Sequence, residues 1–102
     1  MDIAEARYVE GYKIFIRYPD GAEGVIDFSD HHRNNLFAAW NDVEFFRAFR
    51  VNPESGTLEW PNQLDLAPEY LYSRVSGVPI EKAWSVMMAY HNAHITPHGT
   101  NA

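Results

Sequence analysis

The sequence has no cysteine among its 102 residues. This absence excludes disulfide bonds, thiolate metal sites and cysteine nucleophiles, and it favours a reducing cytoplasm over an exported location. Basic residues are also few: 8 Lys and Arg stand against 14 Asp and Glu, for a formal net charge of −6. Direct binding to nucleic acid is therefore not expected. The charge fits a basic protein partner, but the preferred interpretation is that it simply keeps a small domain soluble.

Long apolar runs and catalytic motifs are missing as well. No run approaches the eighteen or so apolar residues of a membrane span, and the first residues are acidic where an export signal needs basic ones. We expect a cytoplasmic protein without a membrane partner. The sequence has no glycine-rich phosphate loop, no Gly-x-Ser-x-Gly elbow and no carboxylate pair on one helix face. We therefore expect no enzymatic activity, no catalytic residue and no cofactor.

The patterns that are present predict one small domain with several strands. Hydrophobic residues make up 46% of the chain, and 102 residues suffice for a single core. Alternating apolar residues predict antiparallel strands over residues 3–9, 12–18 and 22–28. Gly11 and the sequence Pro19-Asp20-Gly21 supply the two turns between them. The three strands should form a meander.

A second hairpin and several helices should follow the meander. Residues 48–52 and 57–60 are predicted strands, and Asn41 is the expected cap of a short helix before them. A helix should begin at Pro68 and end at Gly77. We therefore predict an α+β fold: an antiparallel three-stranded meander plus a second β-hairpin, with short helices and a C-terminal amphipathic helix.

The stretch from Trp60 to Pro68 should organise the rest of the chain. Trp60 is the expected core anchor, because it alternates with the preceding apolar residue as in a half-buried strand. Pro61 ends the strand and Asn62 turns the chain. Asp65 is interpreted as a buried carboxylate that accepts loop amides and holds the turn, rather than as a catalytic base. Pro68 then opens the next helix.

Several of these segments occur together in one order, and together they resemble a known family. They are Tyr12-Lys13-Ile14-Phe15-Ile16, Pro19-Asp20-Gly21, Val25-Ile26-Asp27-Phe28, Phe46 through Val51, and Leu58-Glu59-Trp60-Pro61-Asn62 leading to Asp65-Leu66-Ala67-Pro68-Glu69-Tyr70-Leu71. The chain resembles, over roughly residues 5 to 75, the small bacterial family called domain of unknown function 2442. Gln63 stands where that family usually has glycine. The resemblance implies a small α+β fold with no established activity and, for some members, a helix-turn-helix extension or a toxin-like partner encoded nearby.

Residues 79–102 lie beyond the resembling part, so we divide the chain into a domain over residues 1–78 and a C-terminal helical extension with a frayed tail. Apolar residues at helical spacing predict one continuous stripe along this extension. The stripe is made of Ile80, Ala83, Trp84, Met87, Met88 and His91. The stripe could pack on the domain's own sheet or on another chain. On the second reading, four of these residues are the expected partner-binding residues: Ile80, Trp84, Met87 and Met88.

Two functions from different classes follow from this stripe. The first is a non-catalytic protein-interaction module, antitoxin-like or adaptor, that binds a protein partner or itself as a homodimer through the C-terminal helix. Its partner would be basic and encoded beside it. The alternative is a dimeric transcriptional regulator that contacts DNA.

Two histidine groups could in principle hold a metal or move protons. His91, His94 and His98 have ligand-like spacing, but the segment around them contains proline and glycine and lacks an acid, so surface histidines on a loose tail are preferred. His31-His32 lies near Asp27 and Asp30 in an expected loop over residues 29–35. A plain polar loop is the preferred interpretation there too, and no metal site is predicted.

Overall fold

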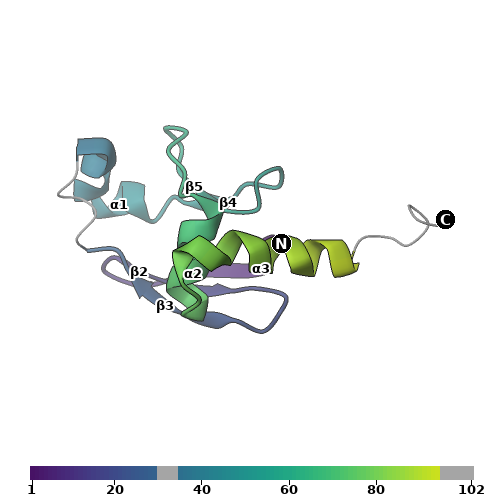
Figure 1. Ribbon diagram of the computed structural model, residues 1–102. Coiled ribbons are helices and arrows are strands. Elements are labelled where there is room, and N and C mark those ends of the chain that lie inside the picture. The colour runs from purple at the N-terminus through teal and green to yellow at the C-terminus, as the bar shows by residue number, and fades with distance from the viewer. Residues whose placement is uncertain (30–34, 95–102) are drawn as a thin grey trace.

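The chain has the α+β fold that the sequence predicts. The computed structural model describes residues 1–29 and 35–94. Within them, a three-stranded sheet and a two-stranded hairpin combine with one 3-10 helix and three α-helices (Figure 1). In chain order the elements are β1 (Glu5–Glu10), β2 (Lys13–Arg17), β3 (Glu23–Asp27), the 3-10 helix η2 (Asn35–Asn41), α1 (Val43–Phe46), β4 (Arg50–Val51), β5 (Leu58–Glu59), α2 (Pro68–Ser76) and α3 (Ile80–His94).

The three strands form the predicted antiparallel meander, with β2 in the centre. The turn before β3 closes when the amide of Tyr18 donates to the carbonyl of Ala22 over 2.8 Å. The carboxylate of Asp20 accepts the amide of Ala22 over 2.9 Å. Gly21 takes a φ of 95°, a conformation that a residue with a Cβ rarely adopts. These contacts confirm the predicted turn.

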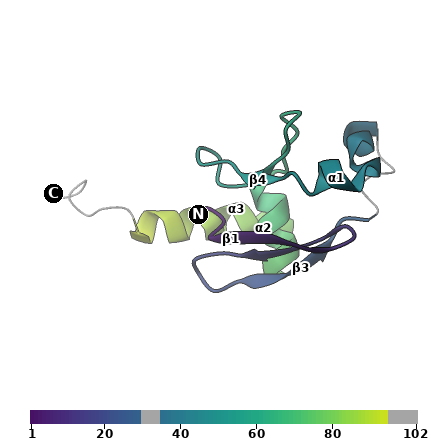
Figure 2. The ribbon, with the colours of Figure 1, turned by 180° about the vertical axis from the view of Figure 1, so that it is seen from behind.

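One face of the sheet is buried and the other is open. The helices α2 and α3 lie along the same side of the sheet in both ribbon views (Figures 1 and 2). Across the open face, Arg7, Phe15 and Val25 stand in one cross-strand row, and the Arg7 guanidinium lies 4.4 Å from the Phe15 ring centroid. The buried face carries the alternate apolar residues that the sequence pattern predicts: Ile14, Ile16, Tyr18, Ile26 and Phe28.

The second hairpin is present, but its strands have two residues each instead of the predicted 48–52 and 57–60. Asn52 accounts for the shortening at the turn end of the hairpin. Its side-chain oxygen accepts the amide of Glu54 over 2.7 Å, and its carbonyl accepts the amide of Gly56 over 2.7 Å. These bonds turn the chain at once, so the strand pairing stops earlier than the sequence suggests.

The N-terminal residues connect this hairpin to the meander. The amide of Ile3 donates to the carbonyl of Gly56 over 2.9 Å, and the Ile3 side chain is buried in the core. A Cβ added at Gly56 would lie 2.9 Å from the Cα of Asp2, and Gly56 has a φ of 73°. Glycine is therefore required at this position for two separate reasons.

The helix caps match the predictions with one correction. The prediction that Asn41 caps the short helix is wrong, because Asn41 belongs to η2 and Asp42 caps α1 instead. Asp42 has the extended backbone of a cap, and its carboxylate accepts the amide of Glu44 over 3.0 Å. Pro68 begins α2, and Gly77 ends it with a φ of 83°, as predicted.

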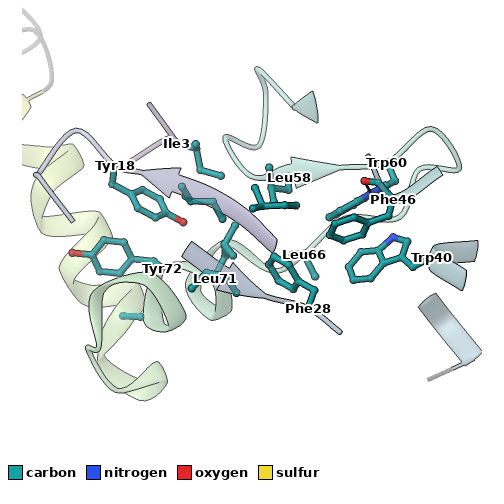
Figure 3. Packing of buried hydrophobic residues seen from close by; sticks show 14 of the residues in the cluster. Ile3, Tyr18, Phe28, Trp40, Phe46, Leu58, Trp60, Leu66, Leu71 and Tyr72 are labelled. Atoms are coloured by element: carbon teal, nitrogen blue, oxygen red, sulfur yellow. Dashed lines mark hydrogen bonds between the residues drawn. The ribbon is translucent and has the colours of Figure 1, made fainter. Parts of the chain in front are cut away.

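The core contains a tight aromatic group at one end (Figure 3). The ring centroids of Trp40 and Trp60 are 4.5 Å apart, and those of Trp40 and Phe46 are 5.1 Å apart. The indole nitrogen of Trp60 donates to the carbonyl of Phe46 over 2.8 Å. The second hairpin is thereby fixed to α1, and the predicted burial of Trp60 in the core is confirmed.

At the other end of the core, Tyr18 and Tyr72 pack edge to face with ring centroids 5.0 Å apart (Figure 3). The hydroxyl of Tyr72 donates to the carboxylate of Asp20 over 2.6 Å. Burial, and then the hydrogen bond to Asp20, raise the pKa of Tyr72 to about 12. Burial likewise raises the pKa of Tyr18. Both hydroxyls therefore stay neutral near pH 7, and the Tyr72 hydroxyl attaches the β2–β3 turn to α2.

Replacing Trp60 should test whether the aromatic group controls stability. Trp60 is 2% exposed, so Trp60→Ala should lower the free energy of unfolding by about 3–5 kcal/mol. Trp60→Phe keeps a ring but loses the donor to Phe46, and its loss should be smaller. Urea unfolding measures both variants, and a loss below about 1 kcal/mol for Trp60→Ala would contradict the anchor role.

Candidate functional site

The turn between β5 and α2 is built from backbone bonds and one asparagine. The amide of Trp60 donates to the carbonyl of Leu64, and the amide of Gln63 donates to the carbonyl of Trp60, each over 2.8 Å. The side-chain oxygen of Asn62 accepts the amide of Leu64 over 3.1 Å. Gln63 has a φ of 69°, so a residue with a Cβ occupies a position that suits glycine. Pro61 and Asn62 lie on the exposed side of this turn.

The prediction that Asp65 is a buried carboxylate holding loop amides is wrong. Asp65 is exposed, while Leu66 after it is buried. Its backbone forms an isolated antiparallel bridge with Glu59, so side chains alternate at this point as they do in a strand. That alternation turns Leu66 inward and Asp65 outward. Asn62 and the carbonyls of the turn accept the amides that Asp65 was expected to bind.

A shallow groove of about 410 Å³ lies beside this turn. Its rim holds an ion pair in which Arg50 lies 3.0 Å from the carboxylate of Glu59, and Asn52 donates to the same carboxylate over 3.0 Å. The sequence analysis missed this group, although Arg50 and Glu59 would have stood opposite each other once the hairpin was aligned. Arg50 and Asn52 both contact the same carboxylate oxygen of Glu59, Oε1. Its lining residues are Ala48, Arg50, Glu59, Trp60, Pro61 and Gln63.

The apolar stripe of α3 is divided between the core and the surface. Ala83 is fully buried and Met87 is 3% exposed. Ile80 is 49% exposed and Trp84 is 53% exposed. Met88 is half-buried, one turn after Trp84. We call Ile80, Trp84 and Met88 the exposed stripe of α3.

Met87 was predicted as a partner-binding residue, and the structure contradicts this. Met87 is one turn after Ala83 on the face that joins the core, and α2 packs against α3 there. The small side chain of Ala83 lets α3 pack closely at this point. In the sequence, this small residue was the one sign that this side of the helix faces the core. The core therefore extends past residue 78. The separate folding of residues 1–78 remains a prediction.

The histidine groups fall largely outside the described residues. His31 and His32 lie in the undescribed segment 30–34, and His98 lies in the undescribed segment 95–102. His91 is exposed on α3. Asp27, the acid near the first group, accepts the amide of Ser29 over 2.9 Å, and hydrogen bonds from Ser29 lower its pKa. Among the residues that the structure describes, no three acids or histidines gather as a metal site would require.

The comparisons with known proteins identify a family and no activity. The sequence model of the family described as Protein of unknown function (DUF2442) matches residues 3–77. The chain belongs to this family. The DUF2442 match stops before α3, so the exposed stripe lies beyond the matched region. Comparison with curated proteins and with solved structures gave no match. In the described part of the chain, no helix has the length and apolar character needed to span a membrane.

Gln63 offers a direct test of the turn in this DUF2442 domain. A left-handed backbone conformation destabilises a residue with a Cβ by about 1–2 kcal/mol. Glycine avoids this cost, but its greater freedom in the unfolded chain lowers the free energy of unfolding by about 0.5–1 kcal/mol. Gln63→Gly should therefore raise the free energy of unfolding by about 0.5–1 kcal/mol, whereas Gln63→Ala should leave it nearly unchanged. Urea unfolding compares them, and destabilisation by Gln63→Gly would show that the Gln63 side chain itself supports the turn.

Met87 and Met88 form a natural pair for testing the division of α3. Met87→Ala should lower the free energy of unfolding by about 2–5 kcal/mol, because it leaves a cavity in the core. Met88→Ala removes the same atoms from a half-buried position and should cost less than half as much. Thermal and urea unfolding give both values. Equal losses would mean that α3 is rotated about its axis, so that Met87 and Met88 are buried to the same extent.

Proposed function

We propose that this protein is a non-catalytic protein-interaction module, antitoxin-like or adaptor, which binds its partner through the exposed stripe of α3. The exposure of Trp84 carries the proposal. Tryptophan is enriched among the residues that dominate binding energy at interfaces, and an exposed indole beside exposed Ile80 is unfavourable in water. Met88 adds an unbranched side chain that adapts to irregular partner surfaces.

The charge of the chain supports a basic partner. The net charge is −6, and such a charge speeds the approach of a basic protein and slows that of an acidic one. A cytoplasmic location belongs to the same proposal, because a chain without cysteine suits a reducing compartment.

A regulator that contacts DNA is the weaker proposal, because the described arginines are engaged at separate places. Arg17 lies 3.1 Å from the carboxylate of Glu5 on the open face of the sheet. Arg50 is paired with Glu59 on the second hairpin. Phosphate contacts would have to compete with these acids. A protein partner requires no such rearrangement.

Capture from the native host, followed by measurement with the purified partner, tests the proposal. Wild-type protein should retain a specific protein that Trp84→Ala does not retain. With that protein purified, Trp84→Ala should raise the dissociation constant at least tenfold, which is about 1.4 kcal/mol.

Ser85→Ala is the matched control, since Ser85 is an exposed neighbour outside the stripe. It should bind as the wild type does. Equal binding by wild type and Trp84→Ala would contradict the proposal, because the partner would then use another surface.

A further inference from the structure

Three charged residues lie side by side across the second hairpin and the segment after it. Arg50 on β4 is paired with Glu59 on β5, and the backbone of Asp65 pairs with Glu59 from the other side. Directly opposed residues of antiparallel strands project from the same face, with Cβ atoms about 4.5–5.5 Å apart. Arg50, Glu59 and Asp65 therefore form one row, which we call the charged row. Its charges run positive, negative, negative.

The central carboxylate of the charged row is bound on one oxygen only. Two nitrogens of Arg50 contact Oε1 of Glu59, Nε over 3.1 Å and Nη2 over 3.0 Å, and Asn52 donates to the same oxygen over 3.0 Å. Within the part of the chain that the structure describes, no donor pairs with Oε2 of Glu59 or with the carboxylate of Asp65. The Glu59 side chain is 19% exposed, so a charged donor brought by a ligand would form a strong bond there.

The order of charges in the row favours a cation as that donor. Two acids directly opposite each other repel, and the one arginine of the row lies on the far side of Glu59 from Asp65. A cation between Glu59 and Asp65 would make the charges alternate along the row. The net charge of −6 adds a general attraction for a cation.

The groove beside the row provides apolar surface for the stem of a basic side chain. It has a volume of about 410 Å³, and Glu59 shares its lining with exposed Ala48 and Pro61. Lysine and arginine lay their methylene stems along apolar surface while the charged head binds an oxygen. A bare metal ion would make no use of such walls. The lining therefore favours a basic side chain as the ligand.

Gln63 lines the same groove with its backbone at a φ of 69°. A residue with a Cβ is strained in this conformation, and strain of this kind gathers where a side chain serves a function. The side-chain oxygen of Gln63 is one more acceptor for a cation at this groove.

We propose that the groove binds a basic side chain of another protein, whose cation lies between the carboxylates of Glu59 and Asp65 beside the amide of Gln63. The proposal goes beyond the proposed function, because all of these residues lie outside α3. The same protein would therefore carry a second binding site, with a charged ligand in place of an apolar one.

Titration of the full chain with a short peptide tests the site directly. The probe is the capped peptide acetyl-Gly-Arg-Gly-amide, and NMR spectroscopy follows the backbone amides of Glu59, Gln63 and Asp65. These signals should shift in a saturable way. The same peptide with citrulline has nearly the same shape without the charge, and it should bind at least about tenfold more weakly.

Conservative variants of the two acids test which oxygens hold the cation. Glu59→Gln keeps an oxygen for Arg50 and Asn52 but puts an amino group in the place of Oε2, so it should raise the dissociation constant at least about tenfold. Asp65→Asn changes an exposed charge and should raise it about two- to fivefold. Glu54→Gln is the matched control, because Glu54 is an exposed acid of the same hairpin outside the groove. It should bind as the wild type does.

Gln63→Gly separates binding from folding. It should be more stable than the wild type, because glycine relieves the strained backbone, and yet it should bind the arginine peptide more weakly. Unfolding cannot produce this combination. Unchanged affinity in this variant would contradict the place of Gln63 in the site.

The outcomes separate this proposal from the proposed function. Equal binding of the arginine and citrulline peptides overturns the groove site, and so does equal binding by the wild type and Glu59→Gln. The proposed function survives either result if Trp84→Ala still abolishes capture of a protein. Charge-dependent binding that Glu59→Gln and Asp65→Asn weaken, and Glu54→Gln does not, establishes the groove site.

Discussion

The hydrogen bond from the Trp60 indole to the Phe46 carbonyl, inside a group of packed aromatic rings, is the contact on which the rest of the structure depends. Its two ends belong to elements that the sheet does not hold directly. Trp60 follows β5, and Phe46 ends α1. A polar bond shielded from water is costly to leave unmade, so it fixes the angle between hairpin and helix in a way that apolar packing does not. The turn after Trp60 then begins at a fixed place and delivers Pro68 to the start of α2.

From that point the position of α3 follows. α2 begins at Pro68, ends at Gly77 in the left-handed conformation, and leads into α3 over a few residues. Ala83 and Met87 complete the packing of the core. The exposed stripe of α3 then lies on the neighbouring, outward-facing side of the same helix. One helix therefore both closes the core and presents the candidate binding surface. The two roles use neighbouring faces, so a change of only a few residues could alter one without the other.

Several carboxylates among the described residues are bound within the protein itself. The acid beside the groove is already bound by Arg50 and Asn52. Asp20 accepts the hydroxyl of Tyr72, and Asp27 accepts the amide of Ser29. These carboxylates hold turns and strands in place. This use of charge is consistent with a protein that acts by presenting a surface, which is the role we propose for it.

Local chemistry in the sequence determined the meander, the Pro19-Asp20-Gly21 turn, the ends of α2 and the anchor role of Trp60, because each depends on neighbouring residues and on alternation. Tertiary contacts decided the remainder. Asp65 faces outward because the bridge to Glu59 sets its side, and Asn52 shortens the second hairpin through bonds that propensity does not show. The stripe of α3 looks continuous in sequence, since periodicity gives the apolar face but not how far a neighbour covers it. Only packing against α2 and the core buried Met87 and left Trp84 in solvent.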